Sequence, residues 1–135
     1  MKFKKIIALG NIELTPEANS KLKDYCEEIY FYKPFLKEDK ELIEIIGDSD
    51  CLLVSWETVV SKTVIENCKK LKYIGMCCSL YDEKSANVDI KAAREKGITV
   101  LGVRDYGDNG LIEYVISELI RLLNGYGEKQ WKKTK

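Results

Sequence analysis

The residues best suited to chemistry in this sequence are its cysteines, and their spacing limits what they can do. Cys77 and Cys78 are adjacent, whereas Cys26, Cys51 and Cys68 stand apart. An odd number of cysteines without regular spacing is not a disulfide framework. The sequence has no histidine and no Cys-x-x-Cys, so imidazole acid–base chemistry is excluded and no metal site is expected. We interpret Cys77–Cys78 as small apolar residues at a strand end rather than as a redox pair, because adjacent cysteines bridge only with strain.

Short apolar runs, which predict strands, alternate along the chain with stretches that predict helices. The predicted strands cover residues 4–9, 28–32, 51–54, 71–77 and 98–103. The predicted helices begin at Thr15–Pro16 and then cover residues 37–46, 62–70, 90–96 and 110–123. Thr15, Ser61 and Asp89 are placed to cap helix starts, and Gly47 and Gly97 to end helices. The pattern predicts an α/β fold: a flavodoxin-like, doubly wound, parallel five-stranded sheet with helices on both faces.

Ligands of such sheets bind at the carboxyl ends of the strands, near the switch in strand order. The loops at that edge are residues 10–14, 55–60, 77–88 and 104–109. The first lacks the hydroxyl- and Gly-rich run with which flavodoxins hold a phosphate, and it lacks the paired acids of a response-regulator receiver. No Gly-x-Gly-x-x-Gly occurs in the sequence, so no dinucleotide fingerprint is present. Trp56 follows a strand at this edge, where it either shapes a pocket or plugs the core.

The segments from Asp48 to Leu123 resemble, in order, the motifs of the D-isomer-specific 2-hydroxyacid dehydrogenases. Residues 48–55 read DSDCLLVS, similar to the family's A-D-A-L-I-V-R-S. Residues 71–75, LKYIG, are similar to L-K-V-I-G, and residues 87–100, NVDIKAAREKGITV, to N-I-D-L-x-A-A-x-E-K-G-I-x-V. Residues 103–107, VRDYG, resemble V-P-D-Y-G. Taken together, these matches identify the chain as a substrate-binding (catalytic) domain of that family.

The resemblance implies an oxidoreductase that acts on a small 2-hydroxy or 2-oxo acid with NAD. In the family a Rossmann domain binds NAD and carries the catalytic Arg, Glu and His, so no catalytic residue and no cofactor are expected within this chain. Backbone N–H groups around Ser79–Leu80 are expected to hold the substrate carboxylate. We predict substrate contacts at Ser55, Trp56, Cys78, Ser79, Leu80, Tyr81 and Tyr106. Tyr106 is equally well explained as a packing residue.

The loop after the fourth predicted strand departs from the family pattern. The family usually has a Gly before Tyr-Asp, where this chain has Leu80, and about four residues are added before Asn87. A side chain at a position that favours a positive φ is expected to disturb the anion-binding turn. Asp82 and Glu83 also add negative charge beside the predicted substrate. A stand-alone binding or interaction module without redox activity is therefore kept as the alternative function.

The last predicted helix is apolar around much of its circumference, more than a helix on a two-layer surface requires. It is either deeply packed or contacts a partner, and we expect the partner to be an NAD-binding domain or a second copy of the chain, giving a dimer. Residues 1–124 are predicted to form the substrate-binding domain. Residues 125–135 are predicted to be a linker toward an absent NAD-binding domain, so the chain alone is expected to be a truncated, inactive enzyme.

Bulk composition excludes several other classes. The 135 residues are enough for one domain. Apolar residues make up 45% and charged residues 33% of the chain, which is typical of a globular protein and not of a disordered one. Lys plus Arg and Asp plus Glu both number 22, so there is no basic excess to bind nucleic acid or an anionic membrane. The short apolar run after Lys5 is no signal sequence, and we expect a cytoplasmic protein.

Overall fold

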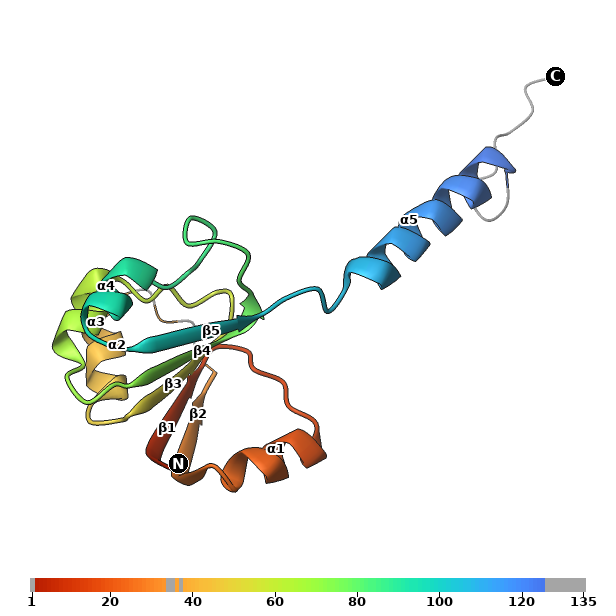
Figure 1. The fold of residues 1–135 in the computed structure, drawn as a ribbon. Helices are drawn as coiled ribbons and strands as arrows, with labels where there is room; N and C mark the ends of the chain where they lie inside the picture. Colours follow the sequence, from red (N-terminus) through yellow and green to blue (C-terminus); the bar gives the residue numbers. More distant parts are fainter. Residues whose placement is uncertain (1, 34–35, 37, 126–135) are drawn as a thin grey trace. The chain divides into compact units, whose positions relative to one another are not determined.

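The computed structural model describes residues 2–33, 36 and 38–125, which form two separate units, one ending at Arg104 and the other beginning at Asp105. The strands are β1 (Phe3–Leu9), β2 (Cys26–Tyr32), β3 (Cys51–Val54), β4 (Tyr73–Ser79) and β5 (Thr99–Val103). The helices are α1 (Pro16–Lys23), α2 (Asp39–Ile46), α3 (Lys62–Asn67), α4 (Ile90–Glu95) and α5 (Asp108–Leu123). All but α5 belong to the first unit (Figure 1).

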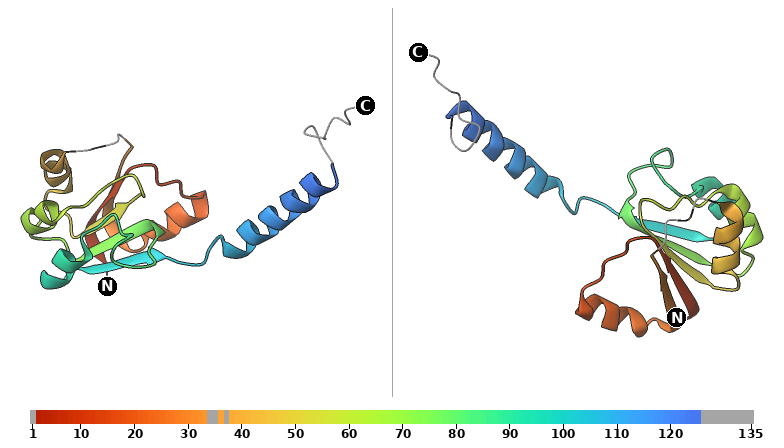
Figure 2. Two further views of the ribbon diagram at one scale, coloured as in Figure 1. Left: turned by 90° about the horizontal axis from the view of Figure 1, so that it is seen from above. Right: turned by 180° about the vertical axis from the view of Figure 1, so that it is seen from behind.

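The five strands form one sheet in the order β2-β1-β3-β4-β5, and every neighbouring pair is parallel. The chain moves outward from β1 to β2 and then crosses back to β3, so strand order switches between β1 and β3. This is the flavodoxin-like order. The predicted α/β class, the five parallel strands and the helices on both faces are confirmed (Figure 2).

The predicted capping residues begin three of the helices. The Thr15 hydroxyl accepts a hydrogen bond from the Ala18 amide at 3.2 Å, and Pro16 occupies the first helical position. The Ser61 hydroxyl accepts from the Val64 amide at 3.3 Å, and the Asp89 carboxylate accepts from the Ala92 amide at 2.9 Å. Each cap satisfies an amide that the helix itself leaves without a partner.

Several element boundaries differ from the prediction by one to three residues, and packing and pairing explain two of them. α3 ends at Asn67 rather than at residue 70, because the buried Cys68 leaves the helical conformation and its carbonyl accepts from the Leu71 amide at 3.2 Å. β4 ends at Ser79 rather than Cys77, because its pairing with β5 shifts register between Met76 and Ser79. The second cause lies outside the short windows from which periodicity is read, because it depends on the partner strand.

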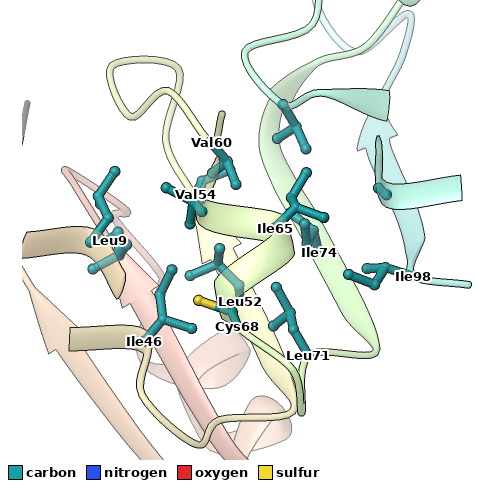
Figure 3. Close-up of a cluster of buried hydrophobic side chains, with 14 of the residues drawn as sticks. Leu9, Ile46, Leu52, Val54, Val60, Ile65, Cys68, Leu71, Ile74 and Ile98 are labelled. Carbon is teal, nitrogen blue, oxygen red and sulfur yellow. The ribbon is translucent and has the colours of Figure 1, made fainter. Parts of the chain in front are cut away.

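The main core lies between one face of the sheet and the layer of α2, α3 and α4. Residues of β1, β3 and β4 alternate along each strand, and those that point to this layer are fully buried. Leu52, Val54 and Ile74 are 0% exposed. They pack with Leu9 of β1 and with residues from the helices and connecting segments, among them Ile46, Val60, Ile65, Cys68, Leu71 and Ile98 (Figure 3).

The opposite face of the sheet carries α1 alone among the helices of the first unit (Figures 1 and 2). α1 has no buried residue. Ile6 of β1, Cys26 of β2 and Cys51 of β3 form a small buried cluster on this face. Farther along the sheet, the β5 side chains Leu101 and Val103 are 56% and 45% exposed.

The second unit, described by itself, contains α5 and its flanking residues. α5 begins at Asp108, slightly before the predicted start, and has no buried residue. Its exposed apolar side chains are Leu111, Ile112, Tyr114, Val115, Ile116, Leu119, Ile120, Leu122 and Leu123. Apart from Gly125, the predicted linker 125–135 lies outside the described residues. No helix in the described part of the chain has the length and apolarity needed to span a membrane.

Candidate functional site

The switch in strand order brings the ends of β1 and β3 into close contact. Gly10 follows β1 with a φ of 87°, and a Cβ added there would lie 2.1 Å from the Ser55 Oγ atom. Ser55 is 3% exposed, and its amide donates to the Leu9 carbonyl at 3.0 Å. Only glycine satisfies both the positive φ and the close approach. The Ser55 hydroxyl is buried and has no hydrogen-bond partner among the described residues.

Asn87 ties the loop after β3 to the end of β4. Its side-chain amide donates to the Ser55 carbonyl at 2.8 Å and to the Thr58 carbonyl at 2.6 Å. The Cys78 thiol donates to the Asn87 Oδ1 atom at 3.5 Å. Burial raises the pKa of Cys78, which favours the neutral thiol that can donate this bond. Ser55 and Cys78, two of the predicted site residues, are thus joined through a third residue.

The end of β4 is bulged, and this explains how Leu80 is accommodated. Met76 pairs with Gly102 and Ser79 with Val103, so two residues of β4 have no partner in β5. Beyond the bulge, the Leu80 amide donates to the Val103 carbonyl at 3.1 Å. A Cβ added to Gly102 would lie 2.4 Å from the Leu80 Cβ atom, so the glycine on β5 makes room for the leucine.

Leu80 does not have the positive φ that the family's glycine suggested. Asp105 is the single non-glycine residue with a positive φ in the described ranges. Leu80 therefore causes no backbone strain of the expected kind. Its effect on anion binding is different: its N–H already donates to the Val103 carbonyl, so this amide is committed to the sheet.

The added residues after Tyr81 form a turn around Asp82. Its carboxylate accepts from the Lys84 amide at 2.9 Å and from the Ser85 amide at 2.8 Å. The hydrogen bonds from Ser85 and Lys84 hold the pKa of Asp82 below its usual value. Glu83 forms an ion pair with Arg94 on α4. Both added acids are therefore engaged by neighbouring groups.

Arg104, the residue after β5, fastens this loop from the other side. Its Nε atom donates to the Leu80 carbonyl at 2.6 Å, and its Nη2 atom donates to the Tyr81 carbonyl at 2.7 Å. The two bonds use adjacent N–H groups along one edge of the planar guanidinium. They fix the peptide groups of Leu80 and Tyr81 relative to β5.

The predicted aromatic contacts are all exposed. Trp56 is 72% exposed and Tyr81 is 51% exposed, so neither plugs the core. Tyr106 is 70% exposed and belongs to the second unit. A hollow of about 310 Å³ lies between the loop after β3 and the loop before α4, lined by residues that include Val60, Ser61, Asn87 and Asp89.

The structure thus brings most of the predicted site to the carboxyl edge of β3, β4 and β5. Ser55 and Trp56 follow β3, and Cys78–Tyr81 end and follow β4. Sequence reasoning did not single out Asn87 and Arg104, whose side chains hold these loops together. The signal for Arg104 was present, since it occupies the position of Pro in the motif V-P-D-Y-G.

The parallel sheet and its strand order define a class: the flavodoxin-like α/β domains, whose ligands generally bind at the topological switch point. Within that class, the chain belongs to the D-isomer specific 2-hydroxyacid dehydrogenase family, whose catalytic domain matches residues 6–128. The resemblance read from the sequence is confirmed.

Individual relatives are enzymes much longer than this chain. It is 31% identical over 124 residues to D-3-phosphoglycerate dehydrogenase 2 of Saccharomyces cerevisiae, a match covering 92% of this chain and 25% of the yeast protein. It is 28% identical over 101 residues to a hydroxypyruvate reductase of Blautia hydrogenotrophica, covering 75% of this chain and 30% of that protein. The matches therefore span between a quarter and a third of these relatives.

Solved structures share the fold. The PH0520 protein from Pyrococcus horikoshii OT3 superposes with a TM-score of 0.67 at 27% identity, covering 90% of this chain and 34% of that one. An NAD+-bound 3-phosphoglycerate dehydrogenase from Entamoeba histolytica gives a TM-score of 0.66 at 21% identity, covering 97% of this chain and 42% of that one. At 21% identity, the comparison with the Entamoeba histolytica protein shows a shared fold only.

Proposed function

We propose that this chain is the substrate-binding domain of an NAD-dependent D-2-hydroxyacid dehydrogenase. The observation that carries the proposal is the match of the family's catalytic domain to residues 6–128. The exposed loops at the switch point of the sheet support it, because ligands of open parallel sheets bind there. The substrate class is a small 2-hydroxy acid or the corresponding 2-oxo acid, which the domain binds and orients for oxidation or reduction at C2.

The residues of this chain do not fit NAD. The turn between β1 and α1 contains one glycine, Gly10, which is pressed against Ser55, and α1 begins with Pro16. No Gly-x-Gly-x-x-Gly occurs in the 135 residues. NAD is therefore bound by a dinucleotide-binding domain outside these residues, and the 135-residue polypeptide by itself does not oxidise a hydroxy acid.

Within the site, the substrate lies against the ends of β3 and β4. Ser55, Trp56 and Cys78–Tyr81 line this position, and Asn87 holds the two loops in register. Tyr106, the remaining predicted contact, belongs to the second unit and stays a prediction. The apolar surface of α5 contacts either the NAD-binding domain or a second copy of the chain, because an apolar surface of this extent is unfavourable in water. The protein acts in the cytoplasm.

Binding to the 135-residue polypeptide tests the proposal. Amide NMR spectra are recorded during titration with pyruvate, a 2-oxo acid, and with pyruvamide, which has the same carbon skeleton but no carboxylate. We expect saturable shifts at Ser55, Trp56 and Cys78–Tyr81 with pyruvate and none with pyruvamide. Absence of saturable binding would contradict the substrate-binding role and favour a module without redox activity. Production of NADH from D-lactate by this polypeptide would contradict the assignment of NAD to another domain.

A further inference from the structure

Arg104 combines two features that the proposed function leaves unexplained. Its guanidinium is exposed at the carboxyl edge of the sheet, and its Nε and Nη2 atoms are anchored to the carbonyls of Leu80 and Tyr81 at 2.6 and 2.7 Å. It makes no ion pair with any carboxylate in residues 2–33, 36 and 38–125. The side chain is therefore held in place by neutral carbonyls, and its positive charge is not neutralised.

The anchoring leaves a defined part of the guanidinium free to bind a ligand. The two carbonyls occupy the edge formed by Nε and one side of Nη2. The remaining N–H groups on Nη1 and Nη2 lie along another edge, with the spacing that binds both oxygens of a carboxylate. Because the carbonyl bonds fix the plane of the guanidinium, less side-chain entropy is lost when an anion binds.

The carboxylates of the neighbouring loop do not neutralise Arg104. Asp82, in the same loop, accepts from the amides of Lys84 and Ser85. Glu83 is paired with Arg94 on α4. Both carboxylates already have donors, so neither neutralises Arg104, and its outer N–H groups remain available to a ligand.

Amide groups of the same loop are largely committed. The Leu80 N–H donates to the Val103 carbonyl, and the N–H groups of Lys84 and Ser85 donate to Asp82. A loop that binds a carboxylate through its backbone needs such amides to be available. In this loop the guanidinium of Arg104 instead lies beside the peptide groups of Leu80 and Tyr81.

We propose that Arg104 is a substrate-binding residue that takes the carboxylate of the 2-hydroxy or 2-oxo acid through its outer N–H edge, and that it also positions the Leu80–Tyr81 loop. The inference rests on the proposed function, because it assigns the anion partner within that site. The proposal links two departures from the family motifs. Leu80 stands where the family has a glycine, and Arg104, which donates to the Leu80 carbonyl, stands where the family has a proline.

The test measures pyruvate binding to the 135-residue polypeptide and to three variants. Arg104→Gln removes the charge and should weaken binding about tenfold or more, the size of a lost charge-assisted hydrogen bond. Arg104→Lys keeps the charge without the planar fork and should weaken it severalfold. Arg94→Gln is the matched control: it removes the same charge from an exposed arginine that touches the same loop through Glu83, and it should change the Kd less than twofold.

A second readout separates positioning from charge. Hydrogen exchange of the amides in residues 80–83 should speed up in both Arg104 variants, because the two carbonyl bonds are lost, and should stay unchanged in Arg94→Gln. Equal pyruvate affinity of the wild type and both Arg104 variants would overturn the inference and leave the proposed function standing. Equal weakening by Arg94→Gln would also overturn it, since general charge would then account for the effect. If the wild type binds no pyruvate, the proposed function and this inference fail together.

Discussion

The two faces of the sheet in the first unit differ sharply in how the chain covers them. On one face, α2, α3 and α4 form a layer over side chains that are fully buried, such as Leu52 and Ile74. On the other, α1 is the one helix among the described residues of the unit and has no buried residue, and Leu101 on β5 is 56% exposed. Parallel sheets are normally covered on both faces.

This difference indicates which face contributes most of the free energy of folding of the unit. Apolar area removed from water is the main favourable term in folding, and within the unit most of that area lies under α2–α4. The candidate site is at the edge where the two faces meet, on loops that the covered face holds in place. Substitutions of one residue type on the two faces should therefore have unequal effects.

The largest expected effect comes from truncating a leucine on each face. Leu52→Ala removes a fully buried side chain and should lower the free energy of unfolding by about 3 kcal/mol. Leu101→Ala removes a side chain that is 56% exposed and should cost less than about 1 kcal/mol. Urea denaturation followed by circular dichroism measures both changes. Equal losses for the two variants would mean that the second face is covered as fully as the first.

The labelling rates of two native cysteines compare the same two faces in the wild-type chain. Cys68 is 2% exposed in the core under the helices, and burial raises its pKa to about 11. Cys77 is exposed and points to the opposite face from Ile74 and Met76. Burial also raises the pKa of Cys77, so the expected difference in labelling rests mainly on whether the reagent can reach the sulfur atom.

An aromatic disulfide reagent at pH 8 should therefore label Cys77 roughly a hundred times faster than Cys68, whose labelling should follow unfolding. A variant with both Cys77→Ser and Cys78→Ser provides the control, because Cys78 is only half-buried; it should remove the fast phase and leave the slow one. A fast phase that persists in this variant would show that a thiol of the covered face is accessible.

Sequence patterns predicted the features of this structure that depend on residues close together in the sequence. Thr15, Ser61 and Asp89 cap helices as expected, because each cap bonds an amide three residues away. The strand cores followed from apolar and β-branched runs. The alternation of strands and helices predicted the flavodoxin-like sheet. The family motifs then indicated the loop after β4 as the candidate substrate site, which stays a prediction.

The rest of the site depends on contacts that no local pattern contains. The bulge before Leu80 exists because β4 pairs with β5, where Gly102 leaves room for the leucine. Asn87 bonds carbonyls that lie 32 and 29 residues away in sequence. Arg104 was visible as a departure from a motif, but its partners are set by the loop 23 and 24 residues earlier. Such residues are identified only when the strands are placed side by side.

The smallest expected effect concerns α5, whose apolar side chains are as exposed as those of the open face. Leu119 is 54% exposed, and if copies of the chain associate through α5, Leu119→Glu should raise the dissociation constant about tenfold. Ser117→Glu adds the same charge to the same helix, among its polar residues, and should leave association unchanged. Sedimentation velocity over a range of concentrations measures both. A wild-type polypeptide that stays monomeric, or two variants that dissociate alike, would show that α5 is exposed for another reason than self-association.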